Sequence, residues 1–569
     1  MEIFLAGIIL VSVLIQGGFY PTIFLGAACA LACGNLFSGK RKYDRIDYAL
    51  CVVVGLYLLT SIINGYGSES LAQACLPGAC ALFLHAYRKL TPEKKTSMLR
   101  KVTLGSWIFA GGAILAFCGI IPLTGAISSR RLQFTFQYAN AAGSWFAAQS
   151  LLSQNSEEPN IRRSSLPMLT ALLLTRSIGA LGLYAIAELV TLWHRRQEYV
   201  WQDMILEHVL AAGFALVFYV SSGWIAVVLL LILYVAGWYW GRVSSAFCKM
   251  HLHWAALLIG IIGATAVFLS QRFSSGLHTF VERLVQILDG LRIIATHPLY
   301  GIGAGNWEEL YPYYQSAQYT SSVVHSSVIQ IGADAGIFTI IAAIAFFIFA
   351  WRRGGRKFGE SLAAMLLATH SLLDFTLQFF PITVLLLALL FAGEEPVPAK
   401  QRWLEPAVLL AFGILCGGLL WGQLQYKQMV QDAQAKDWSS IIAHYGRVPF
   451  GESPTARSVY LQALYNEGNI AGVVQTAQSA EKLRTEELVL YLDALYRLGR
   501  DQEACGKLLE ELEHQLFRVS LFWQGRQLLL GWEADNVYLE RYNEIVDMAN
   551  GSQTVLGRLM GNQVYIEYI

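Results

Sequence analysis

The chain has 569 residues, of which 55% are hydrophobic and only 14% are charged, and its formal net charge is +1. A soluble chain of ordinary composition carries about 25% charged residues, so the composition excludes a wholly water-soluble protein. The near-neutral balance argues against a nucleic-acid partner, which would require a basic surface. The nine cysteines show neither metal-ligand spacing nor the pattern of a disulfide framework.

Long apolar runs alternate with short polar connectors from Met1 to about Gln425. A spanning helix needs about 20 apolar residues, so this region, 1–425, predicts an all-α, polytopic bundle of about 12–15 membrane helices. The first run is short enough for a signal peptide, but no small-residue cleavage site follows it, and we expect a membrane helix. The predicted spans are 3–16, 19–37, 46–64, 70–87, 102–122, 136–153, 166–175, 178–193, 204–221, 223–241, 253–270, 335–351, 360–377, 381–393 and 404–422.

Basic connectors of membrane proteins face the cytoplasm, and the predicted spans put every strongly basic connector on one side. This arrangement requires the run 164–193 to break at Thr175-Arg176-Ser177. The break also keeps Arg176 out of the apolar layer, where a charge costs at least about 2.5–3.5 kcal/mol. The loop 271–325 and the tail 426–569 are then extracytoplasmic. The basic connectors are 39–45, 87–101, 162–163, 194–196 and 351–357.

The tail 426–569 contains an internal repeat. The pairs Leu464/Leu495, Tyr465/Tyr496 and Gly468/Gly499 recur in equivalent settings, at a spacing of about 31 residues, close to that of helix–turn–helix repeats. This pattern resembles a tetratricopeptide array, which presents a concave surface for a protein partner. The alternative is an irregular helical bundle.

The loop 271–325 concentrates residues that can carry chemistry, among them Arg283, Arg292, His297 and His325. Three glycines follow His297, but no Gly-Lys-Ser comes after them, so the loop is not a nucleotide-binding P-loop. We expect these glycines to form a tight turn. There is no Asp-x-Asp carboxylate pair to hold a metal ion, and we predict no metal and no cofactor.

Five segments, in this order along the chain, resemble the O-antigen ligase and polymerase superfamily. The resemblance covers roughly residues 1–425. Two departures stand out: Ser326 occupies a position where many relatives have Asn, and Arg176 is displaced by one residue from the family's arginine. The segments are RLQFTFQYANAAG (131–143), TRSIGA (175–180), HPLYGIGAGNW (297–307), H-S-x9-G-x-x-T (325–339) and HSLLDFTLQFFP (370–381).

The resemblance implies a metal-independent glycosyltransferase in the bacterial inner membrane, acting at its outer face with inversion at the anomeric carbon. The implied donor is a glycan on undecaprenyl diphosphate, and the acceptor is a lipid, a growing polysaccharide or a protein. The catalytic residues would be His325 and Arg176. The residues expected to bind substrate are Arg131, Asn140, Arg283, Arg292, Ser326 and Asp374.

The residue types suit this chemistry. Arginine holds a leaving diphosphate bidentately and stays charged at any working pH, and histidine is a base that titrates near neutrality. The adjacent Arg130 is a weaker candidate than Arg131, which opens the family-like segment. Asp374 lies where it can pair with an arginine. Trp307, Tyr311, Tyr313 and Tyr314 are candidates for stacking on sugars.

Each of these residues has a plainer interpretation. His325 can cap the helix that follows it, Arg176 can anchor at lipid headgroups, and Arg283 and Arg292 can lie on a solvated helix face. The aromatic residues can form an interfacial belt. For the whole protein, the alternative function is a flippase for lipid-linked oligosaccharides, which would place ionisable groups at mid-membrane. A third is a membrane-anchored scaffold that works through its repeats.

Overall fold

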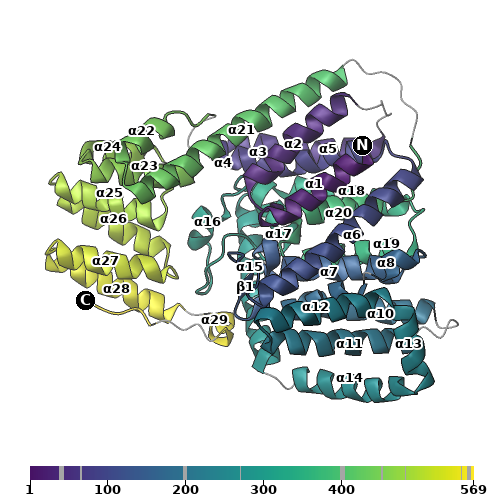
Figure 1. Ribbon diagram of the computed structural model, residues 1–569. Helices are drawn as coiled ribbons and strands as arrows, with labels where there is room; N and C mark the ends of the chain where they lie inside the picture. The colour runs from purple at the N-terminus through teal and green to yellow at the C-terminus, as the bar shows by residue number, and fades with distance from the viewer. Residues whose placement is uncertain are drawn as a thin grey trace. The chain divides into compact units, whose positions relative to one another are not determined.

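The structure is a computed structural model, and it is mostly helical, as the sequence predicted (Figure 1). Much of the predicted connector 39–45, Arg196 and the end of the predicted span 253–270 lie outside the residues it describes. Among the described residues there is one two-stranded antiparallel sheet, β1 (Ile127–Ser128) with β2 (Arg131–Leu132). The described residues are 1–37, 44–64, 67–163, 165–195, 201–268, 271–396, 404–449, 453–480, 482–552, 554–560 and 565–569.

The chain forms two compact units that do not follow the predicted boundary near Gln425. The first unit comprises Met1–Cys51, Leu76–Ser274 and Ala343–Gly413, and the second comprises Val52–Cys75, Ser275–Ala342 and Ile414–Ile569. Most of the predicted extracytoplasmic loop therefore belongs to the same compact unit as the tail. Four helices pass from one unit to the other: α3 (Arg45–Ile63), α15 (Gln271–Thr296), α18 (Ile337–Arg352) and α21 (Leu404–Ala435).

The first unit is a layered bundle around α7, whose residues from Ala139 to Leu151 are buried. Small residues let its neighbours α6, α9, α10 and α19 approach closely. At Gly143 a Cβ atom would lie 2.9 Å from the Cβ of Ser177. The helices of this unit are α1 (Glu2–Leu14), α2 (Pro21–Leu36), α5 (Leu76–Tyr87), α6 (Pro92–Phe117), α7 (Ala139–Gln154), α8 (Pro159–Arg162), α9 (Ser165–Thr175), α10 (Ile178–His194), α11 (Trp201–Val220), α12 (Gly223–Trp238), α13 (Trp240–Lys249), α14 (Leu252–Phe268), α19 (Phe358–Leu373) and α20 (Phe380–Leu390).

One end of the first unit, called here the basic end, collects connectors predicted to be cytoplasmic. The guanidinium of Arg88 is fully buried and donates to the carboxylates of Asp44 (2.7 Å), Asp47 (2.8 Å) and Glu394 (2.6 Å). Arg353 donates to the Asp44 carboxylate as well. The segments before α3, after α5, after α18 and after α20 therefore meet at this end.

The opposite end of the first unit is called here the distal end, and it consists of 15–20, 118–138, 176–177, 221–222 and 374–379. Aromatic rings join these segments: the centroid of Phe375 lies 6.1 Å from that of Phe19 and 4.7 Å from that of Tyr138. The two sets of connectors, basic and distal, are thus separated by the lengths of the helices between them.

The second unit contains helix pairs stacked in chain order. Its predicted repeat corresponds to two such pairs: α23 and α25 each end shortly before a glycine in the left-handed region, Gly468 (φ 79°) and Gly499 (φ 72°). Leu464 and Leu495 are both buried in its core. Its helices are α4 (Gly67–Ala74), α16 (Trp307–Leu310), α17 (Ser327–Ala335), α22 (Trp438–Tyr445), α23 (Pro454–Asn466), α24 (Ile470–Ser479), α25 (Thr485–Arg497), α26 (Asp501–His514), α27 (Val519–Gly531), α28 (Asn536–Gly551) and α29 (Val555–Leu559).

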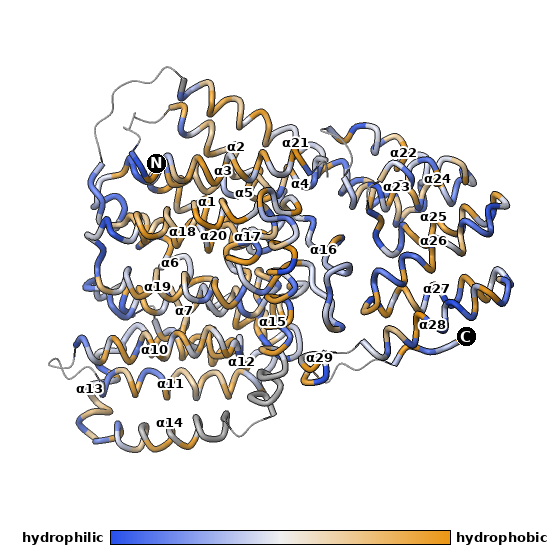
Figure 2. Tube along the Cα trace, turned by 180° about the vertical axis from the view of Figure 1, so that it is seen from behind, coloured by the Kyte–Doolittle hydropathy of each residue, from blue (hydrophilic) through white to orange (hydrophobic). Residues whose placement is uncertain are grey.

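Within the described part of the chain, three helices are both long and apolar enough to cross a membrane, Arg45–Ile63, Trp201–Val220 and Glu405–Ala435. The bent pair α12–α13 makes a fourth if it is counted as one span. Further apolar helices are shorter, with 10–17 residues each. Figure 2 shows hydrophobic residues along most helices of the first unit and a more mixed pattern along α22–α28. The predicted number of spans stays a prediction.

Several predicted elements differ from the structure, and two of the differences have a clear local feature. The span expected at 70–87 is divided into α4 and α5, because the chain turns at Cys75. The span expected to end at 422 continues to Ala435 as α21. Its last turns, QLQYKQMVQDAQA, contain neither Gly nor Pro and consist largely of good helix formers, so a loss of hydropathy there does not end the helix.

Candidate functional site

The segment that leads into α7 at the distal end has an unusual backbone. Ser129, Arg130, Phe134 and Gln137 all have positive φ, between 49° and 54°. Each such non-glycine residue costs about 1–2 kcal/mol, and the surrounding contacts must hold it in place. One of them is the hydrogen bond from the Gln133 N–H to the carbonyl of Ala126, at 2.7 Å. Conformations of this kind concentrate at binding and catalytic sites.

Three of the predicted residues meet at this end. The Arg131 Nε donates to the carbonyl of Thr175 (3.1 Å), and its Nη2 donates to Oδ1 of Asn140 (2.9 Å). The Asn140 Nδ2 in turn donates to Oδ2 of Asp374 (2.7 Å). The contacts connect β2, the start of α7, the end of α9 and the end of α19. Arg131, Asn140 and Asp374, each predicted to bind substrate, thus lie in one hydrogen-bond network, and their role in binding stays a prediction.

Two further side chains complete the network, and neither was predicted as a site residue. The Tyr138 hydroxyl lies 2.9 Å from both carboxylate oxygens of Asp374, which is fully buried. The Ser177 hydroxyl donates to Oδ1 of Asn140 at 2.8 Å. Both residues lie inside segments that resemble the family, 131–143 and 175–180, so their polar side chains within apolar surroundings were the available signal.

Arg176 lies in the predicted break, which the structure confirms. Helix α9 ends at Thr175, α10 begins at Ile178, and Arg176 between them has a φ of 49°. Its Nη1 donates to the Tyr219 hydroxyl at 3.3 Å, and its Cζ lies 5.7 Å from the centroid of that ring. The Cζ of Arg130 lies 5.9 Å from the same centroid. Tyr219, at the end of α11, thus holds two guanidinium groups, and Arg130 contributes to this end together with Arg131.

The predicted residues of the second unit lie on α15 and before α17. The helix α17 begins at Ser327 with Ser326 as its N-cap residue, and His325 lies one residue before that position. The backbone N–H of His325 donates to Oε1 of Gln286 on α15 at 3.4 Å. Ser326 is 4% exposed, and its side chain makes no capping hydrogen bond.

Arg283 and Arg292 lie on α15 in different surroundings. Arg292 is more than half exposed, and its Nη1 donates to Oδ1 of Asp289 at 3.1 Å. Asp289 also accepts from the Ser316 N–H (3.1 Å) and the Tyr319 hydroxyl (3.0 Å). Burial nonetheless raises the pKa of the Asp289 carboxyl above its ordinary value. Arg292 therefore forms an ion pair with a buried carboxylate of the scaffold. Arg283, by contrast, is partly buried.

The glycine-rich turn has a structural role. A Cβ on Gly301 would lie 2.3 Å from the carbonyl oxygen of Ala333, and one on Gly336 would lie 2.4 Å from that of Leu299. Both residues also have positive φ, 60° and 78°. The Ile302 N–H donates to the Ala333 carbonyl at 2.7 Å. The predicted tight turn is confirmed, and it packs against the end of α17.

The suggested stacking of sugars on Trp307 and Tyr311 is wrong for this conformation. Trp307 is fully buried, and its Nε1 donates to the Ser321 carbonyl at 3.2 Å. It stacks on Tyr311 (centroids 5.7 Å apart), which stacks on Tyr319 (5.5 Å). These rings form the core of the loop and leave no face open to a ligand. Tyr313 also makes an internal contact, from its hydroxyl to Glu511 at 2.8 Å.

The same loop is tied to the repeats by a buried ion pair. Oε1 of Glu309 accepts from the Arg484 Nε (2.8 Å) and Nη2 (2.5 Å). Its Oε2 is buried with no hydrogen-bond partner among the described residues. Burial raises the pKa of Glu309 to about 7, although the guanidinium acts in the opposite direction. This carboxyl is a scaffold group that titrates near neutrality.

The predicted site residues divide between the units: Arg131, Asn140, Arg176 and Asp374 lie in the first, and Arg283, Arg292, His325 and Ser326 lie in the second. No protein-family model matches the chain, and no curated protein matches its sequence.

Proposed function

We propose that this protein is a polytopic membrane transferase that moves a glycan from a lipid diphosphate carrier to an acceptor hydroxyl at the outer membrane face. The observation that carries the proposal is the distal end of the first unit. There Arg130, Arg131 and Arg176 are held beside one buried hydrogen-bond network, and two of them have a strained backbone.

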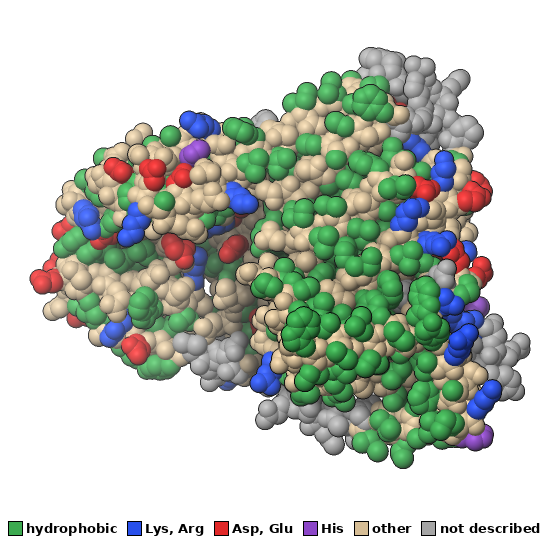
Figure 3. All heavy atoms as spheres, in the orientation of Figure 1, with side chains coloured by type: hydrophobic (Ala, Val, Ile, Leu, Met, Phe, Trp, Pro, Cys, Tyr) green, Lys and Arg blue, Asp and Glu red, His purple; other side chains and the backbone are tan. Residues whose placement is uncertain are grey.

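A membrane location is supported by the surface of the first unit. Figure 3 shows hydrophobic side chains over the region of α10–α14. Val220 is 81% exposed and Trp224 is 84% exposed, and an aqueous surface would rarely carry such a contiguous apolar area. The concentration of Lys and Arg near the basic end favours a cytoplasmic position for that end, which would direct the distal end outward.

The orientation can be tested with single cysteines in a variant that lacks the native ones. Ser128 at the distal end and Glu157 at the basic end are both exposed. We expect Ser128→Cys to react with an impermeant maleimide in intact cells, and Glu157→Cys to react only after lysis. The reverse pattern would overturn the proposed outer-face location.

The arginines suit the departure of a diphosphate. In the proposed step, the acceptor hydroxyl attacks the anomeric carbon, the bond from that carbon to the diphosphate oxygen breaks, and the carrier diphosphate leaves with the electron pair. A cation about 4 Å from the developing charge contributes on the order of 4 kcal/mol at an effective dielectric constant near 20. Preorganised charges of this kind are usually the largest catalytic contribution.

The Tyr138–Asn140–Asp374 network would act by positioning. The amide of Asn140 is held from one side by Asp374 and from the other by Ser177, so its oxygen has a fixed orientation toward Arg131. A fixed guanidinium loses less entropy when it binds a phosphate group. We therefore assign Arg131 to the donor diphosphate and Asn140 to the placement of Arg131.

His325, in the second unit, was predicted as the base that takes the proton from the acceptor hydroxyl, and this role stays a prediction. The helical pairs of the second unit resemble tetratricopeptide repeats, and we propose that they dock a protein acceptor or an assembly partner.

The function is tested by transfer in vitro. Purified full-length protein, a lipid-diphosphate-linked glycan and candidate acceptors are combined in the presence of EDTA, and the transferred glycan is measured. We expect turnover by the parent protein and by the control Arg352→Ala, and none by Arg131→Ala. A flippase would yield no product with any acceptor. Turnover that survives Arg131→Ala would remove the distal end from the chemistry.

A further inference from the structure

The α12–α13 bend places an amphipathic helix across the end of an apolar one. The two helices meet at Tyr239 with an angle of 80° between them. Trp240 and Ser244 are buried on one side of α13, whereas Arg242 and Lys249 are exposed. If α12 crosses a membrane, α13 lies close to the membrane plane, as interfacial amphipathic helices do. The bend would then be at the depth of the lipid headgroups.

A cavity of about 380 Å³ opens at this bend, on the basic end of the first unit. Three arginines line it, Arg162, Arg163 and Arg242, with one acidic residue, Asp203. Arg162 also lies near the Glu207 carboxylate. The Asp203 carboxylate accepts a hydrogen bond from the Ser244 hydroxyl, which partly compensates its negative charge. The excess of guanidinium groups suits an anion with several oxygen atoms, above all a phosphate.

Aromatic rings fix two of these arginines. The Cζ of Arg163 lies 4.9 Å from the centroid of Trp238, and that of Arg242 lies 5.6 Å from the centroid of Tyr239. Both rings are about half exposed, at 47% and 48%. Tryptophan and tyrosine concentrate at the headgroup level of membranes, and the attraction between a cation and an aromatic face helps to hold the two guanidinium groups at that level.

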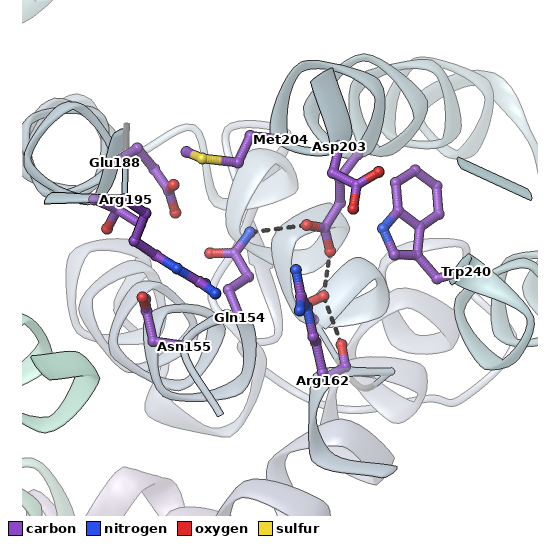
Figure 4. Close-up of a pocket in the computed structure, with 11 residues that line it drawn as sticks. Gln154, Asn155, Arg162, Glu188, Arg195, Asp203, Met204 and Trp240 are labelled. Carbon is purple, nitrogen blue, oxygen red and sulfur yellow. Dashed lines mark hydrogen bonds between the residues drawn. The ribbon is translucent and has the colours of Figure 1, made fainter. Parts of the chain in front are cut away.

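Behind the cavity, the protein is closed by a polar cluster, which Figure 4 shows. The Gln154 Nε2 donates to Oε2 of Glu207 at 3.1 Å, and Ser165 donates to the other oxygen of the same carboxylate. The remaining space is about 20 Å³, room for roughly one water molecule. Glu188 and Glu207 line it together with Arg162 and Arg195, and a space of this size cannot hold a phosphate group, so an anion would be bound in the outer cavity.

We propose that the α12–α13 cavity binds the phosphate of an anionic phospholipid headgroup. Exposed apolar residues of α12, among them Leu231 (62%) and Val235 (57%), continue from the cavity and offer a surface for acyl chains. That surface favours a lipid over free phosphate. The site lies at the end of the first unit opposite to the proposed transfer chemistry, and it depends on the membrane location but not on glycan transfer.

The test is native mass spectrometry of the full-length protein in detergent, with phosphatidylglycerol or phosphatidylcholine added. The site variant is Arg163→Gln/Arg242→Gln. The matched control is Arg100→Gln/Arg352→Gln, which removes the same charge from exposed positions of the first unit. We expect one tightly bound phosphatidylglycerol on the parent and the control, and at least about ten-fold weaker binding to the site variant. Phosphatidylcholine should bind less tightly and equally to all three.

A competition arm distinguishes the source of the phosphate. Displacement of phosphatidylglycerol by excess inorganic phosphate would show that the phosphate group alone accounts for binding and would contradict a lipid ligand. Resistance to displacement would support the lipid as the ligand. Equal binding of phosphatidylglycerol to the parent and the site variant overturns the proposal, and so does an equal loss in the control. The single variant Arg242→Gln, at an exposed position, keeps the test valid if the double variant unfolds, and it should weaken binding as well.

Discussion

Arg88 and Arg176 lie at opposite ends of the first unit, and the protein holds them in opposite ways. Arg88 is fully buried among the carboxylates of Asp44, Asp47 and Glu394, which compensate its charge inside the fold. Arg176 has a strained backbone, and its guanidinium contacts the ring of Tyr219 at the distal end. Arg88 is thus a residue of the scaffold, and we propose that Arg176 belongs to a binding site. Separate variants test the two assignments.

The largest effect on stability is expected from Arg88→Met. Removing the guanidinium leaves three carboxylates together in a buried site, which costs about 3–5 kcal/mol. We expect a much lower yield of folded protein and a lower Tm, but an unchanged specific activity in the fraction that folds. Arg353→Met is the matched control, because Arg353 is partly exposed in the same cluster and should cost less than about 1 kcal/mol. A specific activity that falls with Arg88→Met would place this cluster in the site after all.

Arg176→Gly should separate function from stability. Glycine accepts a positive φ, so the variant is expected to be at least as stable as the parent, by up to about 1–2 kcal/mol. Transfer should fall by about 10²–10³-fold, as for the loss of one preorganised charged donor. Lys436→Gly is the control, since Lys436 is exposed, has a φ of 59° and also loses a positive charge. If Arg176→Gly kept activity, Arg176 would be only a headgroup anchor.

A third arginine, Arg484, forms a buried ion pair with Glu309, and this pair should make the stability of the fold depend on pH. The native carboxyl has a pKa of about 7, above its ordinary value of 4.5, so the folded state binds the additional proton between these values. Stability should therefore fall as pH rises from about 4.5 to 7, by up to about 3 kcal/mol. Thermal unfolding of the full chain across this range should show the slope, and Glu309→Gln should remove it. Glu486→Gln, at an exposed position, should retain it.

The smallest effect on transfer is expected from a change of Tyr219, whose ring contacts Arg130 and Arg176. Tyr219→Leu removes the aromatic face and the hydroxyl that orient Arg130 and Arg176. A cation–π contact at an exposed site contributes about 0.5–1 kcal/mol, so transfer should fall about two- to five-fold with little change in Tm. Tyr239→Leu, at the basic end, should leave transfer unaffected. A loss as large as that of Arg176→Gly would mean that Tyr219 itself touches the substrate.

Local patterns predicted much of the first unit. Apolar runs located its helices, and the argument about the cost of a buried charge located the break at Arg176, which the structure contains. Arg131, Asn140 and Asp374 were predicted as site residues because they lie in segments that resemble a family. The hydrogen bonds that join them were not predicted. Tyr138 and Ser177 were missed because a hydroxyl in an apolar run marks a polar position but does not identify the residue that it contacts.

The features that local sequence patterns did not predict depend on contacts between residues far apart in the chain. The tail was predicted as an addition to the membrane part, yet Arg484 of the tail and Glu309 of the loop form one buried pair within the second unit. The local sequence around either residue looks like that around an ordinary exposed charged residue. The burial of Trp307 was missed for a similar reason: an aromatic residue in a polar loop resembles a ligand-stacking residue until its packing partners are known.

We propose that the distal end, and not the basic end, receives the carrier diphosphate. The most direct measurement is photocrosslinking of the full-length protein with a photoreactive lipid diphosphate, followed by peptide mapping. We expect labelled peptides from 130–140 and 176–177, lost upon competition with the unmodified lipid diphosphate and reduced by Arg176→Gly. Labelling confined to 159–163 and 238–242, the arginine cavity of the basic end, would contradict the account.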